Sequence, residues 1–331
     1  MKTLIYLAAL AVSATAFAAD GGFLFVTFKG EATPLTEQIY FAVSDDGQRW
    51  DALNGEEPVL VSKLGEKGVR DPYLLRSPDG AKFYLIATDL SMNLHRDWGR
   101  AVRAGSKSIV VWESADLVKW SEPRLVKVAA DDAGCTWAPE AFYDEEAKDY
   151  LVFWASKTGG DHFAKHRIWA CRTRDFTSFG EPFVFIERDS DIIDTTIVRE
   201  NGMYYRFSKD ETSKATLMES SAKLTGPWQE TADFSLNKLI GYEGPTCFPV
   251  RPAAGKGATW CLLLDHYSKG EGYKPFVTND LASGKFKTSP GFKFPFRFRH
   301  GSVLAVTAAE LKALKDVYGK APRGGTRLND R

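Results

Sequence analysis

The sequence predicts an all-β fold, a five-bladed β-propeller, from two observations. Short runs rich in β-branched and aromatic residues alternate with Gly, Asp, Asn and Ser turns, and helical periodicity is almost absent. A segment with Ser or Thr, usually an acid, an apolar residue and then Trp or Phe recurs at residues 43–50, 113–120, 172–179, 220–228 and 277–286. A unit of four short strands closed by a turn with an aromatic residue is typical of a propeller blade. The alternative is a β-sandwich of irregular hairpins.

The strands of each blade can be placed from these repeats. Four blades take their inner and second strands from residues 71–89, 139–156, 194–208 and 244–265. The fifth combines strands from both ends of the chain, at residues 23–28, 39–44 and 300–307, which would leave the ring without a free edge. One short C-terminal helix is expected at residues 307–319, because Thr307 and Glu310 form a capping box.

The N-terminus has the pattern of a secretory signal peptide. Lys2 provides a positive charge, residues 4–12 are apolar, and residues 16–18 read Ala-Phe-Ala, a small-x-small cleavage signal. We expect residues 1–19 to be this signal peptide and residues 20–331 to be one propeller domain. A retained anchor is the alternative. No later segment reaches about 18 uninterrupted apolar residues, so we expect a secreted or periplasmic protein without a membrane span.

The charge balance narrows the possible binding partners, and the cysteine content bears on disulfide bonds and zinc sites. The chain has 43 basic and 43 acidic residues and no basic block, which makes nucleic acid and anionic membranes poor partners. The four cysteines allow three disulfide connectivities, and Cys247 with Cys261 is the favoured pair because both flank one expected hairpin. No CxxC spacing occurs, and a zinc site is therefore not expected.

Polar residues precede all five expected inner strands. The position just ahead of each strand holds an acid or a histidine: Asp71, Glu140, Asp194, Glu243 and His300. Inner strands of a propeller start near the axis, so these side chains should converge on one funnel. The expected connections between second and third strands, residues 90–108, 157–166, 209–214 and 267–275, are rich in His, Arg, Trp and Tyr and would form its rim. The alternative is that these acids cap turns or bind a structural cation.

Convergent carboxyl groups suit the cleavage of a glycosidic bond. Burial and neighbouring negative charge can keep one carboxyl group protonated while another stays ionised. A separation of about 6.5–9.5 Å leaves room for a water molecule and leads to inversion of the anomeric carbon. The residues therefore favour a glycoside hydrolase, although they do not identify its sugar.

Four segments, in order, resemble glycoside hydrolase family 43, whose members are inverting arabinofuranosidases and xylosidases on a five-bladed propeller. They are residues 70–89, 137–156, 193–208 and 243–248, and they contain the motifs RDP, WAPE, IDTT and EGP. The resemblance implies that Asp71 is the general base and Glu243 the general acid. It implies that Asp194 orients the acid and raises its pKa. Thr195 departs from the family, which often has Pro there.

The resemblance also implies further site residues and a substrate. Trp137 would line the subsite of the cleaved sugar, with Asp89, His266 and Arg299 as weaker candidates for sugar contacts. No cofactor is required, but a structural calcium ion on the propeller axis, reached from His300 through water, is possible. The implied activity is exo-acting release of terminal α-L-arabinofuranose from plant cell-wall oligo- or polysaccharide. A β-xylosidase or a galactan- or galactofuranoside-cleaving enzyme is the nearest alternative, and a non-catalytic carbohydrate-binding propeller is an alternative of another class.

Overall fold

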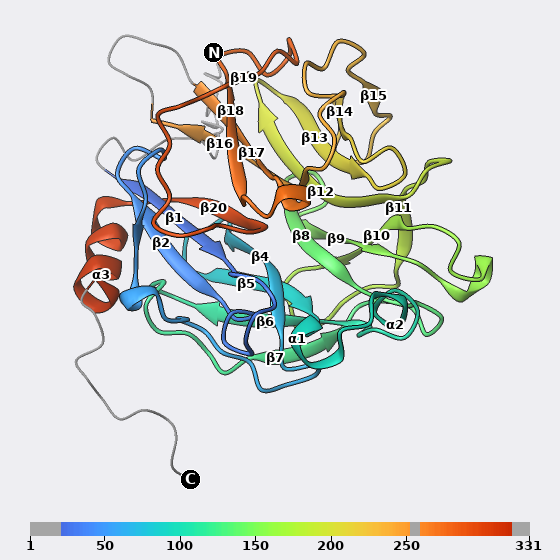
Figure 1. The fold of residues 1–331 in the computed structure, drawn as a ribbon, viewed down its shortest axis with the longest axis horizontal. Coiled ribbons are helices and arrows are strands. Elements are labelled where there is room, and N and C mark those ends of the chain that lie inside the picture. Colours follow the sequence, from blue (N-terminus) through green and yellow to red (C-terminus); the bar gives the residue numbers. More distant parts are fainter. Residues whose placement is uncertain (1–20, 252–258, 320–331) are drawn as a thin grey trace, which may run out of the picture.

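Each predicted repeat forms one four-stranded antiparallel sheet, and the five sheets are arranged in a ring (Figure 1). This computed structural model describes residues 21–251 and 259–319. The predicted signal peptide, residues 1–19, lies outside the described residues. The all-β five-bladed propeller is thereby confirmed.

The strands follow the chain order from the axis outward in four blades. The second blade contains β4 (Val69–Arg76), β5 (Phe83–Asp89), β6 (Ser108–Ser114) and β7 (Arg124–Lys127). The third contains β8 (Trp137–Asp144), β9 (Asp149–Ser156), β10 (Arg167–Thr173) and β11 (Phe183–Ile186). The fourth contains β12 (Ile192–Glu200), β13 (Met203–Asp210), β14 (Thr216–Ser221) and β15 (Gln229–Glu230). The fifth contains β16 (Glu243–Val250), β17 (Thr259–Asp265), β18 (Tyr273–Thr278) and β19 (Lys287–Thr288).

The first blade closes the ring with strands from both ends of the chain, as predicted. Its order is β20 (Gly301–Val306), β1 (Gly22–Thr27), β2 (Tyr40–Ser44) and β3 (Asp51–Ala52). Strand β1 pairs with β20 along its whole length, from Gly22 opposite Val306 to Thr27 opposite Gly301. The ladder between the two ends of the chain therefore fixes the inner strand β20, which His300 directly precedes.

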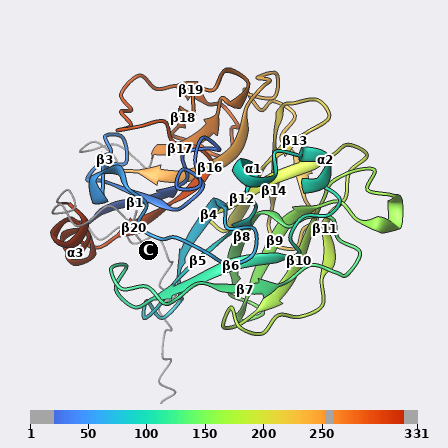
Figure 2. The same cartoon turned by 60° about the horizontal axis from the view of Figure 1, so that its bottom comes forward.

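Helices are few and short. Helix α3 (Ala308–Tyr318) has the predicted capping box of Thr307 and Glu310 and lies on the outside of the closing blade (Figure 2). Helices α1 (Met92–His95) and α2 (Trp98–Ala101) lie in the connection between β5 and β6. Within the described ranges, three 3-10 helices span Asn54–Glu56, Gly159–Asp161 and Tyr267–Lys269. No helix in the described residues is long and apolar enough to cross a membrane.

The apolar core lies in the seams between the blades, and the second strands are its most buried part. Every residue of β5 is buried, and β9 and β17 are buried except at their first residue. Bulky rings fill the seams, among them Trp112, Trp154 and Phe207, each 1% exposed or less. Packing on both faces of a sheet explains why these strands read as continuous apolar runs rather than alternating ones.

The favoured disulfide between Cys247 and Cys261 is wrong. All four cysteines are free and buried. Cys247 is opposite Leu262, whereas Cys261 is opposite Phe248, so the two cysteines are one residue out of register. Successive side chains in a strand point to opposite faces, and the two thiols therefore enter different seams. Cys247 packs with Leu262, and Cys261 with Phe248.

Candidate active site

The inner strands of four blades each contain a bulge near their start. The pairing with the second strand shifts between Arg70 and Tyr73 in β4, and the same shift occurs in β8, β12 and β16. At the bulge each strand has a residue with positive φ: Asp71 at +49°, Ala138 at +47°, Asp194 at +50° and Gly244 at +55°. A bulge re-aims side chains at the rim of a sheet, and Asp tolerates this conformation better than most residues.

The bulges correct one detail of the sequence prediction. The four acids do not occupy one equivalent position, because only Asp71 and Asp194 are at the positive-φ residue. Glu243 comes one residue earlier, at the strand position that Trp137 holds in the third blade. Glu140 comes two residues after the bulge residue of its strand. The acids are also inside the strands rather than ahead of them.

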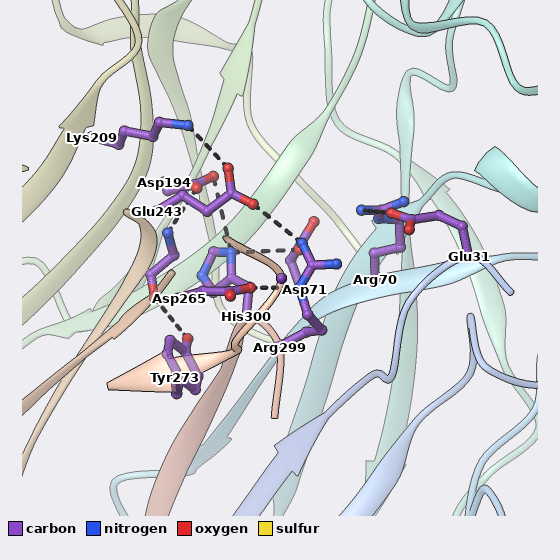
Figure 3. A network of polar contacts seen from close by, with 12 residues as sticks. Glu31, Arg70, Asp71, Asp194, Lys209, Glu243, Asp265, Tyr273, Arg299 and His300 are labelled. Carbon is purple, nitrogen blue, oxygen red and sulfur yellow. Dashed lines mark hydrogen bonds and ion pairs between the residues drawn. The ribbon is translucent and has the colours of Figure 1, made fainter. Parts of the chain in front are cut away.

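His300 lies between the two aspartates at the bulges, as Figure 3 shows. Its Nδ1 atom is 3.5 Å from Asp71 Oδ1 and 4.0 Å from Asp194 Oδ1. The other oxygen of Asp71 accepts a hydrogen bond of 2.9 Å from Thr88, and the other oxygen of Asp194 accepts one of 3.0 Å from the amide of Gly244. Asp71 from β4 and Asp194 from β12 thus meet at the imidazole of His300, which directly precedes β20.

Gly244 is required for this arrangement. Its φ is positive, and a Cβ added to it would lie 2.7 Å from Cγ of His300. The Gly244 carbonyl accepts a hydrogen bond of 2.7 Å from the buried Tyr273 hydroxyl, which in turn accepts one of 3.1 Å from the Gly301 amide. The glycine of the EGP motif therefore lets the acid-bearing strand approach the histidine closely.

Burial and mutual charge shift the pKa values of His300, Asp194 and Asp71. Burial would lower the pKa of His300, but the negative charges of Asp194 and Asp71 outweigh it and raise the pKa to about 9. Burial raises the pKa of Asp194 to about 6, together with the charges of Glu243 and Asp71. Burial would also raise the pKa of Asp71, but the hydrogen bond and charge of His300 outweigh it, and the pKa is lowered. Asp71 is therefore an ionised carboxylate held by an imidazolium ion.

We expect this imidazolium ion to make stability depend on pH between 6.5 and 9. The folded state holds a proton on His300 that the unfolded state has lost, so the stabilisation is complete below pH 6.5 and disappears as the pH rises through about 9. The loss should be on the order of 3 kcal/mol. Denaturant unfolding at several pH values, with a chelator present, measures it. His300→Gln should show no such slope, and an equal slope in that variant would contradict the assignment.

Glu243 is held between two cations, so its immediate surroundings are charged. Lys209 Nζ is 3.0 Å from Glu243 Oε2, and Arg299 Nη2 is 3.3 Å from Oε1. Arg299 also bonds to the buried Asp265 at 2.5 Å. Figure 3 shows Lys209 and Arg299 reaching the carboxylate from different sides. The Glu243 side chain remains 23% exposed, so it can still meet a ligand.

The residues that hold these carboxyl groups, directly or through Arg299, share a strand position that the sequence analysis missed. Thr88, Lys209 and Asp265 occupy equivalent places on the second strands, opposite Arg70, Ile193 and Glu243 respectively. Lys209 was expected in a loop but belongs to β13, with a side chain only 2% exposed. A buried Lys or Asp at the end of an apolar strand was the available signal, since such residues are buried only with partners.

Glu140 is a buried acid that the central network leaves aside. Burial raises its pKa to about 8, and one of its carboxyl oxygens has no hydrogen-bond partner among the described residues. It is 3% exposed. Because a neutral carboxyl group costs far less to bury than a carboxylate, burial favours the protonated form of Glu140.

Aromatic side chains lie beside the network, at the β5–β6 connection. Trp137 contacts Trp98 of α2 edge-to-face, with ring centroids 5.9 Å apart, and packs against His166 at 5.2 Å. Trp98 is 53% exposed, and the guanidinium of Arg70 lies 5.5 Å from its ring. Arg70 is itself bonded to Glu31 at 2.8 Å. Residues 90–108 thus provide an exposed ring next to Trp137 and next to Arg70, the neighbour of Asp71.

The weaker candidates are engaged elsewhere. Asp89 is buried and accepts a hydrogen bond of 2.7 Å from the Glu66 amide, and burial raises its pKa. His266 stacks on Tyr242 at 4.1 Å and bonds to Glu271 at 3.0 Å. Among the described residues, neither side chain forms a hydrogen bond or ion pair with Asp71, Asp194 or Glu243, whereas Arg299 does bond to Glu243. Both therefore remain predictions as sugar contacts.

The calcium ion predicted near His300 also remains a prediction. In residues 21–251 and 259–319, no group of three or more His, Cys, Asp and Glu side chains could hold a metal ion. Nδ1 of His300 is engaged by two carboxylates, so an ion here would depend largely on water ligands. That donor set suits a hard cation such as calcium better than zinc.

Comparison with known proteins identifies relatives by sequence. The family described as "Probable glycosyl hydrolase domain" matches residues 19–312. An α-L-arabinofuranosidase from Bifidobacterium longum subsp. longum is 32% identical over 376 residues, covering 91% of this chain and 35% of the relative. The chain thus spans about a third of the length of that curated relative.

Solved structures share the fold at low identity. An exo-β-1,3-galactanase from Phanerochaete chrysosporium has a TM-score of 0.58 and 13% identity, covering 81% of this chain and 60% of that one. An endo-1,4-β-xylanase from Bacteroides thetaiotaomicron has a TM-score of 0.55 and 14% identity, covering 85% and 92%. A xylan β-1,4-xylosidase from Bacillus halodurans has a TM-score of 0.53 and 16% identity, covering 85% and 58%. These likenesses concern the propeller itself.

Proposed function

Because the chain belongs to glycoside hydrolase family 43, we propose that it is an exo-acting, inverting α-L-arabinofuranosidase that removes terminal residues from plant polysaccharide side chains. The observation that supports this most is the meeting of Asp71, Asp194 and Glu243, from three different blades, around His300 (Figure 3). The three acids of the family motifs are all present, and the proposed base Asp71 and acid Glu243 are partly exposed. A non-catalytic binding propeller would not need a set of carboxyl groups held in this way.

In the proposed reaction, Asp71 and Glu243 act on opposite sides of the anomeric carbon. Asp71, ionised because of His300, accepts a proton from water, and the water oxygen attacks the anomeric carbon. In the protonated form that the reaction requires, Glu243 gives its proton to the glycosidic oxygen as the bond to that oxygen breaks, and the carboxylate that results is the form paired with Lys209 and Arg299. The products are the free sugar with inverted configuration and the shortened polysaccharide.

Asp194 would position the acid through the backbone. Its carboxylate accepts the hydrogen bond of the Gly244 amide, and Gly244 directly follows Glu243. A shift of Asp194 therefore moves the peptide that carries the acid. Its negative charge also lies close enough to Glu243 for each to affect the other electrostatically.

The choice of sugar rests on the relative. The matched protein from Bifidobacterium longum is named an α-L-arabinofuranosidase, which favours arabinofuranose over xylose as the sugar released. β-Xylosidase and galactan-cleaving activities are the second candidates, because solved structures with the same fold carry those names. Export through the segment 1–19 and the axial calcium ion complete the proposal.

A panel of aryl glycosides tests the substrate. We expect release of the aryl group from the α-L-arabinofuranoside at least tenfold faster, in kcat/KM, than from the β-D-xyloside or the β-D-galactoside. A preference for xyloside would replace arabinofuranosidase by β-xylosidase activity. Inactivity on all of them and on arabinan, arabinoxylan and galactan, in the presence of calcium, would favour the binding propeller instead.

A further inference from the structure

A cavity that is widely open to solvent lies between the third and fourth blades, on their outer strands and away from His300. It has a volume of about 590 Å³. It is lined by residues 185–189, by Arg206 and Glu219 from β13 and β14, and by Trp228 and Glu230. The two blades are neighbours in the ring (Figure 1). This volume is within the usual range of small-molecule sites.

The charged pair at the base of this cavity departs from the other blades. Arg206 pairs across the strands with Glu219. The equivalent pairs elsewhere are apolar and buried: Leu85 with Trp112, Val152 with Cys171 and Leu262 with Phe276. Arg206 is only 5% exposed and Glu219 only 6%. Since a buried ion pair is often no more stable than an apolar pair, packing alone does not account for this one.

The guanidinium of Arg206 is fixed but not satisfied. Its Nε atom donates a 2.6 Å hydrogen bond to Glu219, and the group lies 4.3 Å from the Trp228 ring and 5.7 Å from the Phe185 ring. Its Nη1 atom and the indole nitrogen of Trp228 have no hydrogen-bond partner among the described residues. A buried donor without an acceptor is costly, so this arginine is kept here at the expense of stability.

Donors and acceptors alternate around the cavity. Arg188 bonds to Glu219 at 3.0 Å and also to Glu230. The lining has four acidic residues, Glu187, Asp189, Glu219 and Glu230, and two arginines, so a phosphate or an acidic sugar would be repelled. No set of metal ligands is found here in the part of the chain that the structure describes. Hydroxyl groups both donate and accept, and a neutral polyol matches such a lining.

We propose that this cavity is a secondary carbohydrate-binding site, which holds a neutral segment of the polysaccharide while a chain end is hydrolysed at the centre of the ring. Arg206 and Arg188 donate to sugar oxygens, and Glu219 and Glu230 accept from sugar hydroxyls. Phe185 and Trp228 provide the apolar wall. The choice of polysaccharide rests on the proposed function, whereas the site itself does not.

The test exchanges the buried pair for the one in the fifth blade. Arg206→Leu with Glu219→Phe installs the pair formed by Leu262 and Phe276 and should leave the fold and the hydrolysis of aryl glycosides unchanged. In gels containing arabinan or arabinoxylan, we expect its Kd for the polysaccharide to rise about tenfold or more over the parent chain. Both chains carry Glu243→Gln so that the gel polysaccharide is not digested.

A different cavity, on the third blade alone, supplies a matched control. Arg172 lines a cavity of about 360 Å³ and pairs with Asp144 and Asp149, so Arg172→Gln removes a similar arginine. It should leave retardation unchanged. Arg188→Gln, at a half-buried side chain, serves as the second variant if the double exchange does not fold.

Equal retardation of the parent and the exchanged chains would overturn the site, and so would a parent that no polysaccharide retards. These outcomes are separate from the proposed function. An enzyme that cleaves aryl arabinofuranoside without retardation keeps the function and loses the second site. A chain that is retarded through Arg206 but hydrolyses nothing keeps the site and loses the function.

Discussion

Glu243→Gln should lower kcat/KM on arabinan about 10²–10⁴-fold, while it spares substrates with very good leaving groups. Glutamine keeps the size of the side chain but has no proton to give. A polysaccharide leaving group needs that proton, whereas a dinitrophenolate departs without it. The measurement is kcat/KM for a series of aryl glycosides with leaving groups of increasing pKa, compared between the variant and the parent.

Glu113→Gln is the matched control for this series. Glu113 also lies between a lysine and an arginine, Lys82 and Arg124, but on the outer part of the second blade. Its change should leave kcat/KM within about twofold for every leaving group, as is usual for surface substitutions. If Glu243→Gln kept full activity on polysaccharide, Glu243 would not be the acid.

Asp71→Asn should reduce kcat/KM by about 10²–10⁴-fold with every leaving group alike. The amide cannot accept a proton from water, and the need for an activated water does not depend on the departing group. The slope of log(kcat/KM) against leaving-group pKa should therefore match the parent, in contrast to Glu243→Gln. Thermal unfolding monitored in parallel separates this effect from loss of the His300 contact.

Asp149→Asn is the control for Asp71→Asn, since Asp149 binds Arg172 at the start of β9, at the end of the third blade opposite the funnel. It should have parental rates. A variant Asp71→Asn whose loss vanished with good leaving groups would identify Asp71 with protonation of the leaving group, and the roles of Asp71 and Glu243 would be exchanged.

The ring and the three acids could be predicted because both leave short-range signals. Each blade repeats a turn, and the ladder of β1 with β20 follows from apolar segments at the two ends of the chain. Asp71 and Asp194 sit at bulges with positive φ. Such places need particular residues, so they appear in the sequence as compact motifs.

The partners of those acids could not be predicted, because they depend on strand register. Lys209 and Asp265 contact Glu243 or its partner Arg299 only through the pairing of β12 with β13 and of β16 with β17. A shift of either strand pairing by one residue would turn the side chain of Lys209 or Asp265 to the opposite face of its sheet. Strand register also explains why the expected disulfide does not form. Cys247 and Cys261 lie on paired strands, but they are one residue out of register and face different seams. The sequence showed the residue types without their facing neighbours.

The configuration of the first sugar released tests the account most directly. Proton NMR during the first turnovers of an aryl α-L-arabinofuranoside, before mutarotation, distinguishes the two anomers. The arrangement of Asp71 as base and Glu243 as acid predicts β-L-arabinofuranose as the first product, with the α-anomer appearing later by mutarotation. An α-anomer formed first would mean retention and a covalent intermediate, and would contradict the proposed roles of both residues.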